Sequence, residues 1–164
     1  MPFDIIVIKQ QPKYYFGEKC QLCEIEIGGF YERFAAPIET WPIEKYLEQW
    51  ESAVNQIVNG VMKAYLVAAM RQPKKTNFIV VYSLYREGYR VFVRNQMILC
   101  KGNEKQINTE EVIDLINDRE VRNQCEEKIS EWETSLEDLE CYLQRTQMGR
   151  GQSDNCRIPK RKSR

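Results

Sequence analysis

One long amphipathic stretch constrains the fold of this chain more than any other feature. Between residues 43 and 58, apolar residues recur every three or four positions, the spacing that places side chains on one stripe of an α-helix. Thr40 can cap the start of this helix, Pro42 is tolerated in its first turn, and Gly60 is placed to end it. We therefore expect one long helix whose apolar face packs on a sheet. The stripe consists of Ile43, Tyr46, Leu47, Trp50, Val54, Ile57 and Val58.

The segments on either side of this helix have patterns that are typical of strands. Residues 3–8 form a β-branched run that suits a strand buried on both faces. Residues 20–36 alternate around a Gly-Gly pair, which predicts a hairpin. Residues 61–70 are apolar apart from Lys63, and we interpret them as a strand, although a buried helix has the same pattern.

The strongest strand signal is a hairpin in the middle of the chain. Residues 77–85 and 89–94 are rich in β-branched and aromatic side chains. They flank a three-residue connection, residues 86–88, in which Gly88 supplies a positive φ. Residues 97–100 either extend the second strand through a bulge or form another strand.

The C-terminal third predicts two shorter helices. Residues 109–116 begin with a capping threonine and early acids and carry an apolar stripe. Residues 128–132 alternate like a strand. Ser135 then caps a final helix. The apolar face of that helix contains Leu136, Leu139, Tyr142 and Leu143.

The core pattern stops after Gln144, and the remaining residues are polar and basic, a composition that cannot offset the entropy of ordering. The predicted fold is α+β, with a single domain over residues 1–144. We expect a mostly antiparallel sheet packed against one long helix and one or two shorter helices, followed by a disordered basic C-terminal tail over residues 145–164.

Several classes of chemistry are disfavoured by composition. The chain contains no histidine, which removes the commonest general base and the commonest metal ligand. Cys20 and Cys23 have the spacing of a zinc-binding pair, but a structural site needs four ligands and no second pair follows. Without a nucleophile elbow, phosphate loop or histidine-containing metal motif, we expect no enzyme, no cofactor and no metal site.

Cellular location is suggested by what the sequence lacks. No apolar run approaches the ~18–20 residues that span a bilayer, and residues 1–11 lack the basic start and cleavage site of a signal peptide. We therefore expect a cytoplasmic protein with no membrane partner, whose cysteines stay reduced.

The formal net charge of zero conceals a strong asymmetry. Residues 104–140 hold 13 acidic and 4 basic side chains, whereas residues 141–164 hold 1 and 7. An acidic face favours a basic partner. The basic tail could neutralise nucleic-acid phosphates, but the body offers no strand platform of aromatic and basic residues that would hold RNA. Direct nucleic-acid binding is therefore not expected.

A series of motifs occurs in a fixed order along the chain. The series consists of Ile25-Glu-Ile-Gly28 with Phe30-Tyr-Glu-Arg-Phe34, then Trp41-Pro-Ile-Glu-Lys-Tyr46 with Gln49-Trp50, then Leu84-Tyr-Arg-Glu-Gly88 with Val91 and Arg94-Asn-Gln-Met97, and finally Ile129-Ser-Glu-Trp132 with Ser135-Leu-Glu-Asp-Leu139. In this order they resemble the strand, the Trp-x-x-x-x-Tyr-x-x-Gln-Trp helix, the hairpin and the closing strand and helix of the CdiI family, the immunity proteins of bacterial contact-dependent growth inhibition.

The resemblance implies a toxin inhibitor that acts by stoichiometric protein–protein binding. Its partner would be the C-terminal toxin domain of a cognate CdiA effector, often a nuclease that cleaves tRNA, other RNA or DNA. Such toxins tend to carry basic clefts, which the acidic segment would complement. The alternative functions are a zinc-binding or a nucleic-acid-binding regulatory protein. Our candidate toxin-binding residues, which could also be a solvated helix face, are Glu110, Glu111, Asp114, Asp118 and Glu120.

Overall fold

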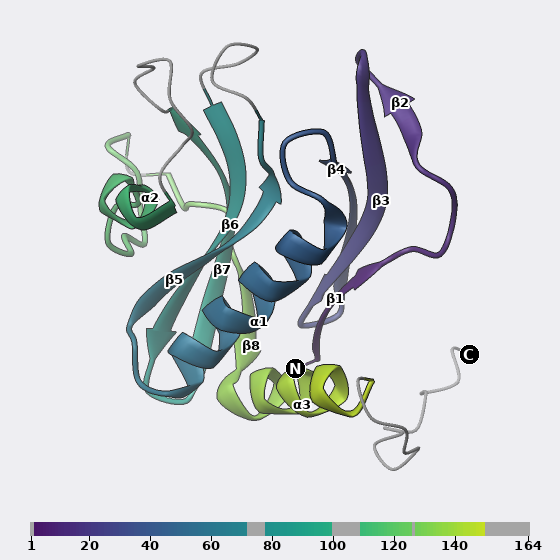
Figure 1. Cartoon of the computed structure of the whole chain (residues 1–164). Coiled ribbons are helices and arrows are strands. Elements are labelled where there is room, and N and C mark those ends of the chain that lie inside the picture. The colour runs from purple at the N-terminus through teal and green to yellow at the C-terminus, as the bar shows by residue number, and fades with distance from the viewer. Residues whose placement is uncertain (1, 72–77, 100–108, 126, 150–164) are drawn as a thin grey trace, which may run out of the picture.

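The computed structural model describes residues 2–71, 78–99, 109–125 and 127–149, without the side chains of Thr109 and Glu110. In this part of the chain, three helices accompany two four-stranded antiparallel sheets (Figure 1). The predicted α+β class is therefore confirmed, with the strands divided between two sheets. The tail, apart from residues 145–149, lies outside the described residues, so its disorder stays a prediction.

The N-terminal sheet is built around one long central strand, β3. Strands β1 and β2 share one edge of β3, and β4 pairs with its other edge in the predicted hairpin. The expectation that β1 is buried on both faces is wrong, because Ile5 is buried whereas Ile6 is exposed. Since β1 is an edge strand of an antiparallel sheet, only one of its faces meets the core. The strands are β1 (Phe3–Val7), β2 (Lys13–Tyr15), β3 (Glu18–Ile27) and β4 (Phe30–Pro37).

The second sheet has the order β5-β6-β7-β8. The predicted strand in residues 61–70 is confirmed as β5. Two other predictions for this sheet are wrong. The β6–β7 turn has two residues, Gly88 and Tyr89, because the ladder continues to the Glu87–Arg90 pair. Strand β8 begins at Trp132, since this is where pairing with β7 starts. The strands are β5 (Lys63–Ala69), β6 (Phe78–Glu87), β7 (Arg90–Leu99) and β8 (Trp132–Ser135).

Strand β7 also settles the alternative left open for residues 97–100. Its register with β6 runs from Arg90 to Leu99 without a shift, so residues 97–99 extend the strand and no bulge intervenes. Cys100 lies outside the described residues.

The predicted long helix is α1 (Ile43–Val58). Its N-cap is Pro42 and no side chain caps it, so the prediction of a Thr40 cap is wrong. Gly60 does end the helix, as predicted: it adopts φ +108°, and its N–H donates to the Ile57 carbonyl while Val61 N–H reaches Gln56. This is the Schellman arrangement, which favours a glycine because of the positive φ.

Side chains of α1 occupy the edge of β5 that pairs with no strand among the described residues. The Gln49 amide donates to the Tyr65 carbonyl and accepts from Val67 N–H, both at 2.8 Å. The Trp50 indole N–H donates to the Val67 carbonyl at 2.7 Å, and Tyr46 accepts from Met70 N–H at 2.9 Å. Because backbone groups of a buried edge need partners, this part of the Trp-x-x-x-x-Tyr-x-x-Gln-Trp motif has a structural role.

Helix α3 (Leu136–Met148) closes the core beside α1 and β1. Ser135 caps it by accepting from Asp138 N–H, as predicted, and all four predicted apolar residues of this helix are buried. The helix continues four residues beyond Gln144, and Arg145 donates to the Phe3 carbonyl at 2.7 Å. This hydrogen bond links the C-terminal helix α3 to the N-terminal strand β1.

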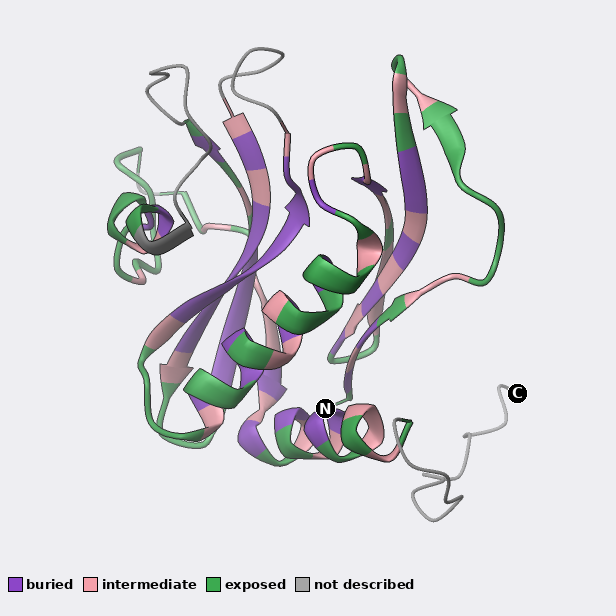
Figure 2. Cartoon of the chain, viewed as in Figure 1, coloured by how far each residue is buried: buried purple, intermediate pink, exposed green. Residues whose placement is uncertain are grey.

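The core lies where α1 meets both sheets. Phe34 of β4 packs edge-on against Trp50 of α1, at 6.0 Å between ring centroids, and lies 5.7 Å from Tyr82 of β6. Figure 2 shows the inner side of α1 and most of β5, β6 and β7 as buried, whereas α2 (Thr109–Leu115) and the segment around it are largely exposed. This exposed region carries most of the predicted site residues.

Candidate functional site

Helix α2 lies against β5 and carries the first of the predicted acidic residues. Val112 and Ile116 are buried and anchor it to the core, while Leu115, which the sequence placed on the same stripe, is about half exposed. The helix has only seven residues, so one short apolar stripe must hold it. Additional contacts fix the irregular chain that follows.

Two side chains from the second sheet hold the chain immediately after α2. Lys63 Nζ donates to the Ile116 carbonyl at 2.7 Å and forms an ion pair with Asp118 at 3.2 Å. The Tyr85 hydroxyl donates to the Asn117 carbonyl at 2.9 Å. Ile116 and Asn117 are thus tied to β5 and β6 by their backbone carbonyls, and Asp118 is tied to β5 by its side chain.

A nearly buried cluster of charges holds the next part of this segment. Glu131 accepts from Arg94 of β7 at 3.0 Å and from Arg119 at 3.2 Å. Arg119 also donates to Glu87 at 2.8 Å and stacks over the Phe92 ring, 3.6 Å from its centroid. Burial by itself would raise the pKa of Glu131, but the two guanidinium groups outweigh it and hold that pKa below its ordinary value.

The structure places the side chains of four of the five predicted residues on α2 and on the chain that follows it. Glu111 and Asp114 lie on α2 and are exposed, and neither has an ion-pair partner among the described residues. The side chain of Asp118 is 97% exposed although it pairs with Lys63. Glu120 is exposed, and its carbonyl accepts from Arg94.

The fifth predicted residue, Glu110, belongs to α2, but its side chain lies outside the described part of the structure.

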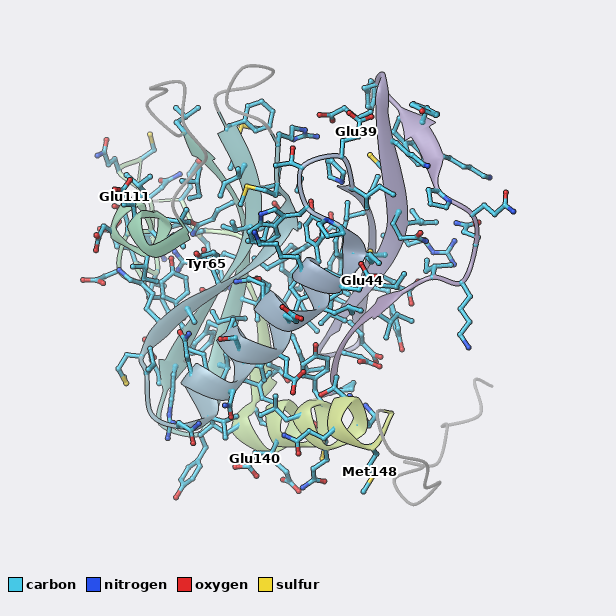
Figure 3. All side chains as sticks on the ribbon, viewed as in Figure 1. Glu39, Glu44, Tyr65, Glu111, Glu140 and Met148 are labelled. Atoms are coloured by element: carbon cyan, nitrogen blue, oxygen red, sulfur yellow. The ribbon has the colours of Figure 1, made fainter. Side chains whose placement is uncertain are left out.

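Figure 3 shows Glu111 on the outer side of α2, directed away from the body. We call Glu111, Asp114, Asp118 and Glu120 the acidic surface.

A hollow of about 290 Å³ lies beside the acidic surface, and sequence reasoning missed it. It is formed where α1 and α2 approach β5, and Figure 3 shows Tyr65, one of its lining residues, between the two helices. No local sequence signal marks it, because its walls come from segments that are distant in the chain. The lining residues are Gln49, Ser52, Ala53, Gln56, Ala64, Tyr65 and Ile113.

The two cysteines with zinc-like spacing are poorly suited to hold a metal. Both are buried, and burial raises the pKa of Cys20 and raises that of Cys23 to about 12. Since the thiolate is the form that ligates zinc, these shifts disfavour binding. Over residues 2–71, 78–99, 109–125 and 127–149, no three His, Cys, Asp or Glu side chains gather in a way that could hold a metal ion.

None of the helices in the described ranges has both the length and the apolar character needed to cross a membrane.

The described residues form a packed α+β scaffold that exposes acidic side chains on α2 and on the chain after it. Comparison with known proteins shows to which family this scaffold belongs. Residues 36–142 match the sequence model of the CdiI N-terminal domain. The immunity protein CdiI of Enterobacter cloacae subsp. cloacae is 31% identical over 134 residues, which cover 80% of this chain and 90% of that protein.

A solved structure gives the same result. A chain of the CdiA-CT/CdiI toxin and immunity complex from Enterobacter cloacae superposes with a TM-score of 0.78 at 28% identity. The match covers 88% of this chain and 98% of that one. The chain belongs to the CdiI family of immunity proteins, which confirms the resemblance drawn from the motifs. These relatives are immunity proteins and not enzymes, and the expectation of a non-catalytic protein is confirmed by them.

Proposed function

We propose that this chain is an immunity protein that binds the C-terminal toxin domain of a cognate CdiA effector and neutralises it stoichiometrically in the cytoplasm of the producing cell. One observation carries the proposal: the fold matches nearly the whole length of a chain in a CdiA-CT/CdiI complex. A backbone likeness at 28% identity supports a shared mode of action, while surface residues set which toxin is bound.

We further propose that the toxin is a nuclease and that it meets the acidic surface. Nucleases bind a polyanion and therefore carry basic clefts, so exposed carboxylates opposite such a cleft would compete with the substrate. Glu111 and Asp114 suit this role because no cation among the described residues neutralises them. The chain after α2 is held by Lys63, Arg94 and Arg119, which keeps the acidic surface in place before the toxin arrives.

This arrangement predicts a particular kinetic behaviour. Carboxylates exposed to solvent attract a basic partner over about one Debye length, roughly 8–10 Å at physiological salt. They therefore raise the association rate more than they lower the dissociation rate, and the effect declines as salt is added.

Rescue by co-expression tests the proposed function directly. Cells that express the toxin domain encoded beside this chain should survive when the chain is present and die when it is absent. Added to purified toxin, the chain should stop cleavage of RNA or DNA at one equivalent. Cell death despite expression of the folded chain would refute the immunity function, and a toxin that cleaves neither nucleic acid would refute the nuclease proposal alone.

A charge-reversal pair tests the acidic surface. Glu111→Lys with Asp114→Lys should lower the association rate about tenfold or more at low salt, and the loss should shrink at high salt. Glu137→Lys with Glu140→Lys is the matched control, because it changes the same number of charges at exposed sites on α3. Equal association rates for the two double variants would contradict the proposed location.

A further inference from the structure

We propose that the hollow between α1, β5 and α2 receives an arginine side chain of the toxin and forms the centre of the interface. This inference rests on the proposed function, because the arginine belongs to the CdiA toxin domain. It deepens that function by naming one receiving site and the chemistry of the group that fills it.

The hollow has apolar walls that are fixed before any partner binds. Ala53 of α1 and Ala64 of β5 are 3% and 2% exposed, and their small side chains leave the space open. Ile113 forms a third wall from α2. The side chain of Gln49 cannot turn into the space, because both ends of its amide are bonded to β5. A volume of about 290 Å³ thus persists without a large change of rotamer.

Two polar groups among the lining residues have unused hydrogen-bonding capacity. The Ser52 hydroxyl and the Gln56 amide make no hydrogen bond with any side chain or backbone group in the described part of the chain. Both are exposed on α1 and supply oxygen acceptors. A guanidinium group carries five N–H donors and no acceptor, so these oxygens complement it.

Unneutralised carboxylates lie on both helices that form the hollow. Glu48 precedes Ser52 by one helical turn on α1, and Glu111 and Asp114 flank Ile113 on α2. All three are exposed and have no ion-pair partner among the residues that the structure describes. The hollow therefore combines apolar walls and oxygen acceptors, and the two helices that form it also carry exposed carboxylates. Arginine has the matching parts, an apolar stem and a delocalised cationic head, and it is enriched at the energetic centres of interfaces.

Other occupants fit the hollow less well. Its volume of about 290 Å³ lies just below the roughly 300–1,000 Å³ of small-molecule pockets, so it suits one side chain better than a metabolite. A second copy of this chain would bring like charges together if the same face were used, because both helices that form the hollow carry exposed carboxylates, Glu48 on α1 and Asp114 on α2. A basic toxin brings the complementary charge.

The test uses the full chain and the toxin domain encoded beside it. Ser52→Phe places an aromatic ring in the hollow from an exposed helical position, and we expect the dissociation constant for the toxin to rise at least about thirtyfold, as when a hot-spot contact is lost. Gln144→Phe is the matched control: it adds the same ring at an exposed position on α3, and binding should be unchanged. If Ser52→Phe does not fold, Ser52→Ala with Gln56→Ala removes the two acceptors without adding bulk and should weaken binding about tenfold or more.

The nature of the occupant is tested by protecting arginines from phenylglyoxal. In the complex with the wild-type chain, one toxin arginine should be protected, and mass spectrometry should find it modified when Ser52→Phe or the double alanine variant is used. No protected arginine, or a Ser52→Phe variant with unchanged affinity, would overturn the proposal while leaving the immunity function intact. Sedimentation that shows wild-type dimers and Ser52→Phe monomers would assign the hollow to self-association and would overturn it as well. Failure of the wild-type chain to bind the toxin would instead refute the proposed function on which this inference rests.

Discussion

Replacing Gln49 by methionine tests whether a helix side chain can complete the edge of a sheet. In the native chain, the two ends of the Gln49 amide bond Tyr65 O and Val67 N, the groups that a neighbouring strand would otherwise bond. Methionine has a similar length and volume but neither donates nor accepts strongly. Gln49→Met therefore removes both hydrogen bonds while nearly preserving the packing of α1 on β5.

The expected loss follows from the burial of the two backbone groups. Val67 is fully buried, so its unpaired N–H costs about 1–3 kcal/mol. Tyr65 lines the hollow, where water can partly replace the lost donor to its carbonyl, so we assign this group the lower end of the same range. The loss of both hydrogen bonds should lower the free energy of unfolding by about 2–4 kcal/mol, and the midpoint of thermal unfolding by roughly 4–16 °C for a chain of this size.

The measurement is urea unfolding followed by tryptophan fluorescence, since Trp50 is fully buried beside the substitution. Gln56→Met is the matched control, because Gln56 lies on the same helix with an exposed side chain and makes no hydrogen bond among the described residues. The control should stay within about 0.5 kcal/mol of the wild type. If the two variants unfold at the same urea concentration, the Gln49 amide does not stabilise the edge of β5 and the reasoning is wrong.

Four further outcomes are expected. Glu131→Gln should lower the free energy of unfolding by about 3 kcal/mol at neutral pH. Because the native pKa of Glu131 is lowered, the difference from the wild type in urea unfolding should shrink as the pH falls below the ordinary glutamate pKa of about 4.3. Phe16→Asn should raise the free energy of unfolding in urea by up to about 1 kcal/mol, because Phe16 is fully exposed at φ +49° in a tight turn; a lower free energy of unfolding would contradict this. Ser135→Ala should lower the free energy of unfolding by about 1 kcal/mol, because it removes the cap of α3, and calorimetry can measure this loss. At pH 8, Ellman's reagent should modify exposed Cys125 in the folded protein but leave Cys23 intact, since burial raises the pKa of Cys23 to about 12.

Elements whose signal is local were predicted well. The stripe of α1, the glycine that ends it and the Ser135 cap depend on residues within a few positions of one another, so periodicity and capping chemistry suffice to find them. The errors fall where a neighbour in space decides. Strand β8 starts at Trp132 and not Lys128 because only there does it pair with β7, and β2 was missed because three residues carry almost no pattern.

The acidic surface shows the same division. Charge counting found that residues 104–140 are acidic, and four of the proposed residues lie exposed on the segment that contains α2. Counting could not show that Asp118 already pairs with Lys63, or that Glu111 and Asp114 have no ion-pair partner among the described residues. Those facts depend on which cations the fold brings near.

The sequence by itself determined the local elements, the absence of histidine-based chemistry and the acidity of residues 104–140. The division into two sheets, the Gln49 amide on the edge of β5, the Glu131 cluster and the hollow were decided by tertiary structure. The physical reason is separation along the chain: Arg94 and Glu131 meet across 37 positions, and α1 and α2 meet across β5. No window of neighbouring residues contains both partners, so only the folded backbone could join them.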